Sequence, residues 1–135
     1  MKPNFLKPVQ QRIFSAEECN KIIDCESYPI TESFAENQPV DGIDNSGDNK
    51  WIWDRIENAL LKINKRHYGF TEPKIYHSIG KKTYKTGDSY LYHQDNLSLR
   101  RLTAVIFLNN DYTGGDLRVF CGKEVVMKNN IGVIA

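Results

Sequence analysis

The sequence predicts an α+β domain in which helices come first and short strands follow. Apolar residues recur at helical spacing in the first half, whereas from Pro73 onward short β-type runs alternate with turn residues. Strands that follow helices, instead of alternating with them, favour a sandwich or jelly roll with helices packed on the outside. We expect a single domain over residues 1–135, with a helical N-terminal part (1–72) and a β core (73–135).

Composition excludes several classes of protein. The chain is 40% hydrophobic, 26% charged and 11% aromatic, which is unlike collagen, disordered chains or membrane-spanning proteins. Its net charge of +1 gives no general attraction for nucleic acid or membranes. The three cysteines (Cys19, Cys25 and Cys121) are an odd number without close metal-ligand spacing, and no signal peptide is visible. We therefore expect a cytoplasmic protein with no nucleic-acid or membrane partner.

Two helices are expected in the first half. Ser15 and Glu18 have the spacing of a capping box, which predicts a helix to about Cys25. Residues 27–48 are polar and rich in turn residues, so we expect a loop there. A stripe of apolar residues predicts a second helix from about Asn49 to His67, ending before Gly69. This stripe, like Trp51 and Trp53, is expected to pack in the core.

Seven short strands are expected in the second half. They are Lys74–Gly80, Lys82–Thr86, Ser89–His93, Arg101–Leu108, Leu117–Cys121, Glu124–Met127 and Ile131–Ala135. Turns are expected at Thr86-Gly87-Asp88, Asn109-Asn110-Asp111, Gly114-Gly115 and Asn129-Asn130, with positive φ at the paired glycines.

One of these strands carries a candidate metal site. Residues i and i+2 of a strand project from the same face, so His93 and Asp95 can point at one ion. A neutral imidazole and a carboxylate are two of the three ligands in the facial triad of non-haem iron(II). His67 and His77 are expected to be surface or packing residues, and Arg100 and Arg101 to be exposed.

The residues around this pair resemble a known enzyme family. The pattern Tyr84, Gly87, Tyr90, His93 and Asp95, followed by Leu108-Asn109 and by Gly114-Gly115-x-Leu117, is similar to iron(II)- and 2-oxoglutarate-dependent dioxygenases. The closest likeness is to the prolyl-hydroxylase-like branch, which includes the prolyl 4-hydroxylases and bacterial and phage members. The resemblance covers about residues 50–135 and implies a cupin-like double-stranded β-helix.

The resemblance also implies individual roles. His93 and Asp95 would ligate iron(II), and Tyr84 would contact the distal carboxylate of the cosubstrate 2-oxoglutarate. Strand alternation places Thr103, Val105 and Phe107 on one face, and the resemblance implies that this face lines the cosubstrate pocket. Phe107 stands where the hypoxia-factor enzymes have a tyrosine, so Tyr84 would have to supply the hydrogen bond. Tyr90 and Tyr92 are expected to be packing or rim residues.

Two family residues have no counterpart here. The third iron ligand, a distal histidine, and the basic partner of 2-oxoglutarate follow the strand that resembles Ile131–Ala135, and no later histidine, arginine or lysine is present. The last two strands of the double-stranded β-helix would be missing as well. We therefore expect a fragment of a longer product, a non-catalytic remnant, or a chain completed by strand addition from a partner.

The expected function is that of a hydroxylase that uses iron(II), 2-oxoglutarate and O2 on a small-molecule or peptidyl substrate, with an incomplete active site in this chain. The alternatives are a non-catalytic jelly-roll binding module and a cupin-like metalloenzyme of another type. Open sheet edges would allow two copies to dimerise.

Overall fold

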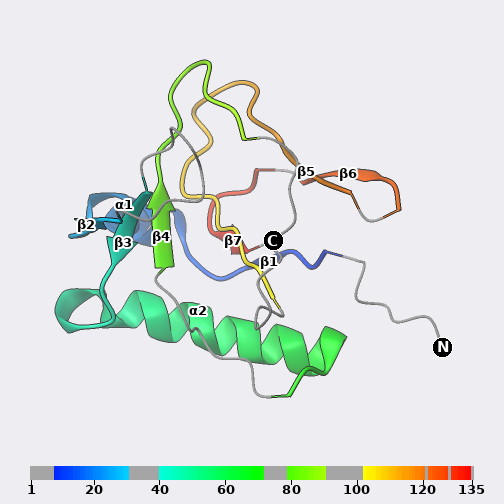
Figure 1. The fold of residues 1–135 in the computed structure, drawn as a ribbon. Helices are drawn as coiled ribbons and strands as arrows, with labels where there is room; N and C mark the ends of the chain where they lie inside the picture. Colours follow the sequence, from blue (N-terminus) through cyan, green and yellow to red (C-terminus); the bar gives the residue numbers. More distant parts are fainter. Residues whose placement is uncertain are drawn as a thin grey trace.

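Figure 1 shows the fold in a computed structural model, which describes residues 8–30, 40–71, 79–90, 102–120, 122–127 and 129–134. In chain order the elements are β1 (Gln11–Arg12), α1 (Ala16–Asp24), β2 (Tyr28–Pro29), β3 (Val40–Ile43), the 3-10 turn η2 (Gly47–Asn49), α2 (Lys50–Ile63), the π-helical turn η3 (Asn64–Tyr68), β4 (Ile79–Lys82), β5 (Leu117–Phe120), β6 (Glu124–Met127) and β7 (Val133–Ile134). Within these ranges the fold is a mixed α+β arrangement of two α-helices and small antiparallel sheets, which confirms the general class predicted from the sequence.

Helix α1 begins and ends with side-chain caps. The Ser15 hydroxyl accepts a hydrogen bond from the Glu18 N–H (3.1 Å), and the Glu18 carboxylate accepts one from the Ser15 N–H (3.0 Å), so the predicted capping box is confirmed. At the other end the Lys81 ammonium donates to the carbonyl oxygens of Ile22, Ile23 and Cys25. These contacts help to satisfy the carbonyls of the last turn, of which that of Ile22 also accepts from the Cys25 N–H (3.3 Å).

Helix α2 continues directly into η3. Together they span residues 50–68 and confirm the helix predicted from about Asn49 to His67. It ends at Gly69, whose φ of 75° is the left-handed conformation typical of a helix C-terminus. The buried Asn64 side chain closes this end, because its amide donates to the Phe70 carbonyl (2.7 Å) and its oxygen accepts from the Phe70 N–H (2.9 Å).

The sheets join the two halves of the chain. Strand β1 pairs with β7, β3 lies between β2 and β4, and β5 pairs with β6, all antiparallel. The prediction of a loop over 27–48 was wrong in part, since β2 and β3 lie there. Pro29, Asp41 and Gly42 have low strand propensity, and the pairing of Val40–Ile43 with Ile79–Lys82 supplies the stabilisation instead.

Of the other predicted strands, some are present in the structure and some are not. β5, β6 and β7 confirm the predictions at 117–121, 124–127 and 131–135, although β7 is shorter than expected and begins after a turn at Gly132. β4 contains the end of the strand predicted at 74–80, but it stops at Lys82, so the strand predicted over 82–86 was wrong. In the described part of 101–108 the structure has one isolated bridge residue, Ile106, and no continuous ladder. Residues 91–93 lie outside the described ranges.

The hydrophobic core lies between α1, α2 and the sheets above α2 (Figure 1). Its buried members are Phe14, Cys19, Ile22, Ile43, Ile52, Trp53 and Ile56. Each large apolar side chain that is fully buried contributes about 1.5–3 kcal/mol to the free energy of folding. Trp51 and Trp53 both pack here, as predicted. None of the helices in the described ranges combines the length and apolar character needed to cross a membrane.

Candidate functional site

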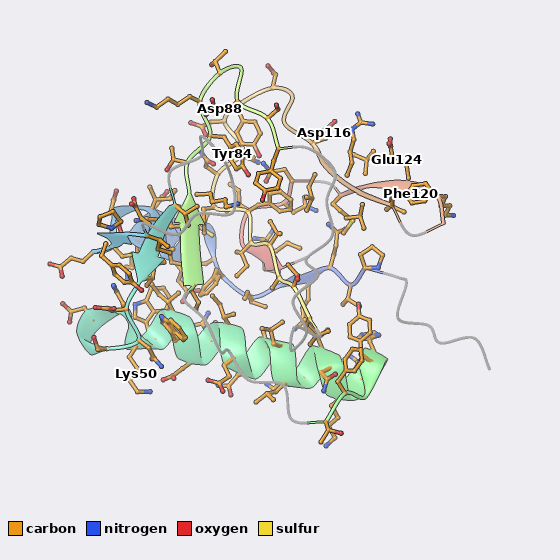
Figure 2. The ribbon with its side chains drawn as sticks, in the orientation of Figure 1. Lys50, Tyr84, Asp88, Asp116, Phe120 and Glu124 are labelled. Atoms are coloured by element: carbon orange, nitrogen blue, oxygen red, sulfur yellow. The ribbon has the colours of Figure 1, made fainter. Side chains whose placement is uncertain are left out.

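The chain reverses direction after β4, around Gly87. This glycine has a φ of 90°, which side chains with a Cβ rarely adopt. The Asp88 N–H donates to the Lys85 carbonyl (2.9 Å), and the Asp88 carboxylate accepts from the Lys85 N–H (2.6 Å). The predicted turn at 86–88 is therefore confirmed, and Figure 2 shows Tyr84 and Asp88 close together on this loop.

The reversal gathers aromatic and charged side chains. The Lys82 ammonium lies 4.4 Å from the centre of the Tyr90 ring, a cation–π contact. Tyr84 is 50% exposed. Partial burial of its phenol raises the pKa of Tyr84, and the nearby Tyr90 and Asp88 raise it further. The Tyr84 hydroxyl is therefore protonated at neutral pH and can donate a hydrogen bond.

The segment 102–108 has two distinct faces, as the sequence predicts. Ile106 and Leu108 are partly buried against the core, whereas Thr103 and Val105 are exposed. Phe107 is half-buried, and its carbonyl accepts a hydrogen bond from the Gly132 N–H (2.8 Å). Thr103 and Val105 are therefore accessible to solvent, whereas Phe107 is partly buried like its even-numbered neighbours. Within the described part of the chain, no hydrogen bond links Tyr84 to this segment.

The predicted iron ligands cannot be placed in this geometry. His93 and Asp95 lie outside the described residues, as do His77, Tyr92, Arg100 and Arg101. His67 is exposed on η3, with its ring 6.3 Å from that of Tyr68, as expected for a surface histidine. Within the described ranges, no three or more histidine, cysteine or acidic side chains lie together in a way that could hold a metal ion.

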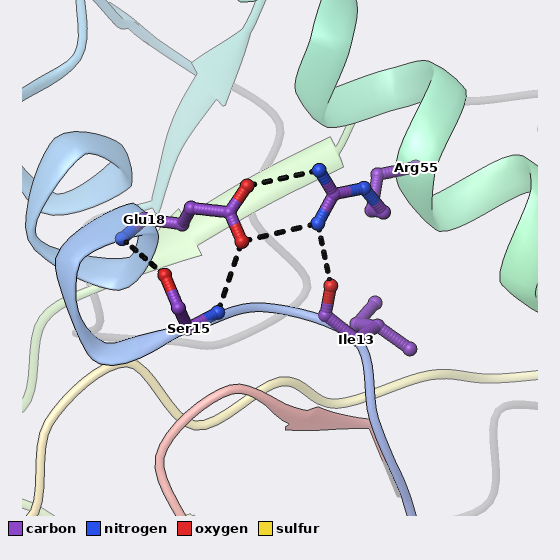
Figure 3. Close-up of polar contacts among 4 residues, drawn as sticks. All are labelled: Ile13, Ser15, Glu18 and Arg55. Atoms are coloured by element: carbon purple, nitrogen blue, oxygen red, sulfur yellow. Dashed lines mark hydrogen bonds and ion pairs between the residues drawn. The ribbon is translucent and has the colours of Figure 1, made fainter.

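A second polar cluster lies at the start of α1, and the sequence did not reveal that Arg55 takes part in it. Arg55 on α2 donates to both oxygens of the Glu18 carboxylate and to the Ile13 carbonyl (2.8 Å), as Figure 3 shows. The hydrogen bond from Arg55, followed by that from the Ser15 N–H, lowers the pKa of Glu18 from 4.5 to about 2. The guanidinium also lies 5.4 Å from the centre of the Phe14 ring. This cluster connects α1 to α2.

The loop before β5 is also held by polar contacts. Gly114 and Gly115 have φ values of 75° and 67°, which confirms the predicted positive-φ turn. The Asn129 amide donates to the carbonyl of Asn109 (2.9 Å) and to the Tyr112 hydroxyl. These contacts tie the loop to the segment that leads into β7.

No protein-family model, no curated protein and no solved structure matches this chain. Its function must therefore be inferred from its own residues.

Proposed function

We propose that this chain is part of an iron(II)- and 2-oxoglutarate-dependent oxygenase of the prolyl-hydroxylase-like type, with a double-stranded β-helix as its core. The observation that carries the proposal is the ordered spacing of Tyr84, Gly87, Tyr90, His93 and Asp95. The left-handed backbone at Gly87 supports it, because a tight reversal there explains why the pattern has a glycine at that position.

His93 and Asp95 would hold the metal. An imidazole nitrogen and a carboxylate oxygen are donors that suit iron(II) and leave other coordination positions open. Bound iron(II) would couple the oxidative decarboxylation of 2-oxoglutarate by O2 to the hydroxylation of a substrate C–H bond. The substrate would be a small molecule or a peptidyl side chain.

The other named residues would bind and shield the cosubstrate. The Tyr84 hydroxyl remains protonated at neutral pH, so it would donate a hydrogen bond to a carboxylate. Thr103, Val105 and Phe107 would form the wall of the pocket from the face of 102–108 that does not contact the core. The aromatic ring of Phe107 would exclude water without donating a hydrogen bond.

Binding of Mn(II) tests the metal site directly. Mn(II) substitutes for iron(II) without being oxidised, and the loss of its free-ion electron paramagnetic resonance signal reports binding. The 135-residue chain should bind Mn(II), whereas His93→Ala and Asp95→Ala should bind much more weakly. His67→Ala is the matched control and should bind like the wild type, because His67 is exposed on η3. Equal binding by wild type and His93→Ala, or no binding at all, contradicts the proposal.

A non-catalytic binding module is the second candidate, and one observation favours it. Phe120 is 70% exposed and Val126 is 46% exposed, on the same face of the β5–β6 hairpin. In this case two copies or a partner would associate through the hairpin, and sedimentation velocity would detect a dimer that Phe120→Ser weakens. His93→Ala would leave that association unchanged.

The cellular location is part of the proposal. Cys19 and Cys25 are free thiols, which is consistent with the reducing cytoplasm expected from the sequence.

A further inference from the structure

The end of α2, where it continues into η3, carries a basic face. Four exposed side chains lie there on successive turns: Leu61, Lys62, Lys65 and Arg66. Residues three or four apart are neighbours on the surface of a helix, so Lys65 lies about one turn beyond Leu61, and Arg66 about one turn beyond Lys62. Helix α2 runs along the lower edge of the molecule in Figure 1, and we call these four side chains its basic face.

The three cations of the basic face are not neutralised by the described part of the chain. In the first half of α2, by contrast, Lys50 binds Asp54 (2.7 Å) and Arg55 binds Glu18 (2.9 Å). Among the described residues, no hydrogen bond or ion pair engages the cations of the basic face. The local sequence contributes to this difference, because residues 58–71 contain no aspartate or glutamate.

The helix itself accounts for only part of this composition. Positive side chains near the end of a helix interact favourably with its dipole, although like charges one turn apart repel each other. The dipole does not explain Leu61, a large apolar side chain that is 40% exposed between the cations. Unpaired cations around an exposed leucine make a surface that is complementary to a ligand with negative charge and an apolar group.

We propose that the basic face binds an acidic segment of a peptide or protein. Aspartate or glutamate side chains of the partner would pair with the three cations, and an apolar side chain would pack on Leu61. Leu61 favours a peptide over nucleic acid, whose contacts with proteins are dominated by phosphates, and a net charge of +1 gives little general attraction for a polyanion. One leucine is too small an apolar area to hold a membrane surface. This inference goes beyond the proposed function and does not depend on it.

Fluorescence anisotropy tests the proposal with a labelled dodecapeptide that repeats two glutamates and one leucine. The wild-type chain should bind this peptide, and binding should weaken as the salt concentration rises, because ions screen exposed charges. The triple variant Lys62→Gln/Lys65→Gln/Arg66→Gln should bind about tenfold more weakly, as expected for the loss of three exposed ion pairs. A peptide with lysine in place of each glutamate should not bind.

Two further variants locate the contact. Lys82→Gln/Lys85→Gln/Lys123→Gln removes three positive charges from exposed positions elsewhere and should bind the acidic peptide like the wild type. Leu61→Ser should weaken binding of the leucine-containing peptide, but it should leave binding of a peptide with serine in place of leucine unchanged. Circular dichroism would confirm that each variant is folded.

Equal weakening by the two triple variants would show a general effect of net charge and would overturn the assignment to the basic face. The proposal also fails if the wild type does not bind the acidic peptide. It fails equally if an oligothymidylate of the same length, or vesicles that contain phosphatidylserine, bind the basic face more tightly than the peptide does. A loss of affinity for both peptides in Leu61→Ser would overturn the apolar contact. None of these measurements involves a metal ion or 2-oxoglutarate, so their failure is distinguishable from failure of the oxygenase proposal.

Discussion

Arg55 and Glu18 meet in a two-point contact, with Arg55 Nη1 3.1 Å from Glu18 Oε1 and Nη2 2.9 Å from Oε2 (Figure 3). The same carboxylate caps α1 by accepting the Ser15 N–H, so one acidic side chain both begins a helix and attaches it to α2. Paired hydrogen bonds of this kind fix orientation as well as distance. The contact therefore sets how the two helices lie relative to each other.

This pair predicts how stability depends on pH. The folded pKa of Glu18 is about 2, below its unfolded value of 4.5, so its contribution is fully present above pH 4.5 and is lost as pH falls from 4.5 toward 2. Both side chains are partly exposed, which limits the effect to about 1 kcal/mol. Glu18→Gln should therefore be less stable than wild type at pH 6 and nearly equal to it at pH 2, as measured by urea unfolding.

The exposed pair Lys50–Asp54 provides the control. These side chains are 62% and 50% exposed and are related as i and i+4 on α2. Asp54→Asn should change the free energy of unfolding at pH 6 by about 0.3–0.5 kcal/mol or less. A larger loss for Asp54→Asn than for Glu18→Gln would contradict the structural role assigned to the Arg55 contact.

Gly132→Ala should strongly destabilise the fold. Gly132 has a φ of 75°, and a Cβ at this position would lie 1.9 Å from the Phe14 carbonyl oxygen. The Gly132 carbonyl accepts hydrogen bonds from the N–H groups of Ile13 and Phe14. These bonds join the segment before α1 to the segment that leads into β7. We expect a loss above about 3 kcal/mol in urea unfolding, combining backbone strain with the clash.

Gly47→Ala measures the cost of left-handed backbone alone, without a steric clash. Gly47 also has positive φ (54°), but no atom would lie within 4 Å of an added Cβ. This variant should lose only about 1–2 kcal/mol, the usual cost of left-handed backbone. Similar losses for both variants would show that the contact with Phe14 does not constrain the fold.

Lys81→Met should loosen the end of α1. The Lys81 ammonium donates to the Ile23 carbonyl at 2.9 Å and to two neighbouring carbonyls, and methionine keeps an apolar stem without the donors. We expect a loss of about 1–2 kcal/mol and faster amide exchange in the last turn of α1. Lys82→Met is the control, because the Lys82 ammonium lies over the Tyr90 ring instead. Equal exchange rates in the two variants would rule out the capping role.

Trp53→Phe tests the link between α2 and β3. The indole N–H of Trp53 donates to the Ile43 carbonyl at 2.8 Å in the buried core. Phenylalanine leaves this carbonyl without its partner and a small void beside it, which should cost about 2–3 kcal/mol. Trp51→Phe keeps the aromatic contact with Phe14 and should cost less, and the reverse order of stabilities would contradict this account.

Local signals in the sequence predicted local structure well. The Ser15 and Glu18 pair predicted the start of α1, and the stripe ending before Gly69 predicted α2. The turn residues predicted turns around Gly87 and Gly114, and the positive φ expected at Gly114 and Gly115 is present. In each case a residue and its near neighbours in the chain provide the hydrogen bonds or the backbone freedom that the structure needs.

Strands were predicted less well, because each depends on a distant partner. Val40–Ile43 contains Asp41-Gly42, a turn spelling, yet it forms β3 because β4 lies beside it. Arg101–Leu108 has the alternation of a strand, but its described part makes no continuous ladder. Of the candidate site, Tyr84, Thr103 and Val105 are exposed, and the roles expected for them, like those of His93 and Asp95, stay predictions.

The sequence by itself determined the helices, the turns and the residue types proposed for the site, since caps, periodicity and glycine conformations act over a few residues. Only the tertiary structure decided the contact of Arg55 with Glu18, the capping of α1 by Lys81 and the position of Lys82 over Tyr90. Two of these contacts join segments far apart in the chain, and the third depends on how the 85–88 turn folds. Their energies depend on distances that folding sets, which no pattern of neighbouring residues specifies.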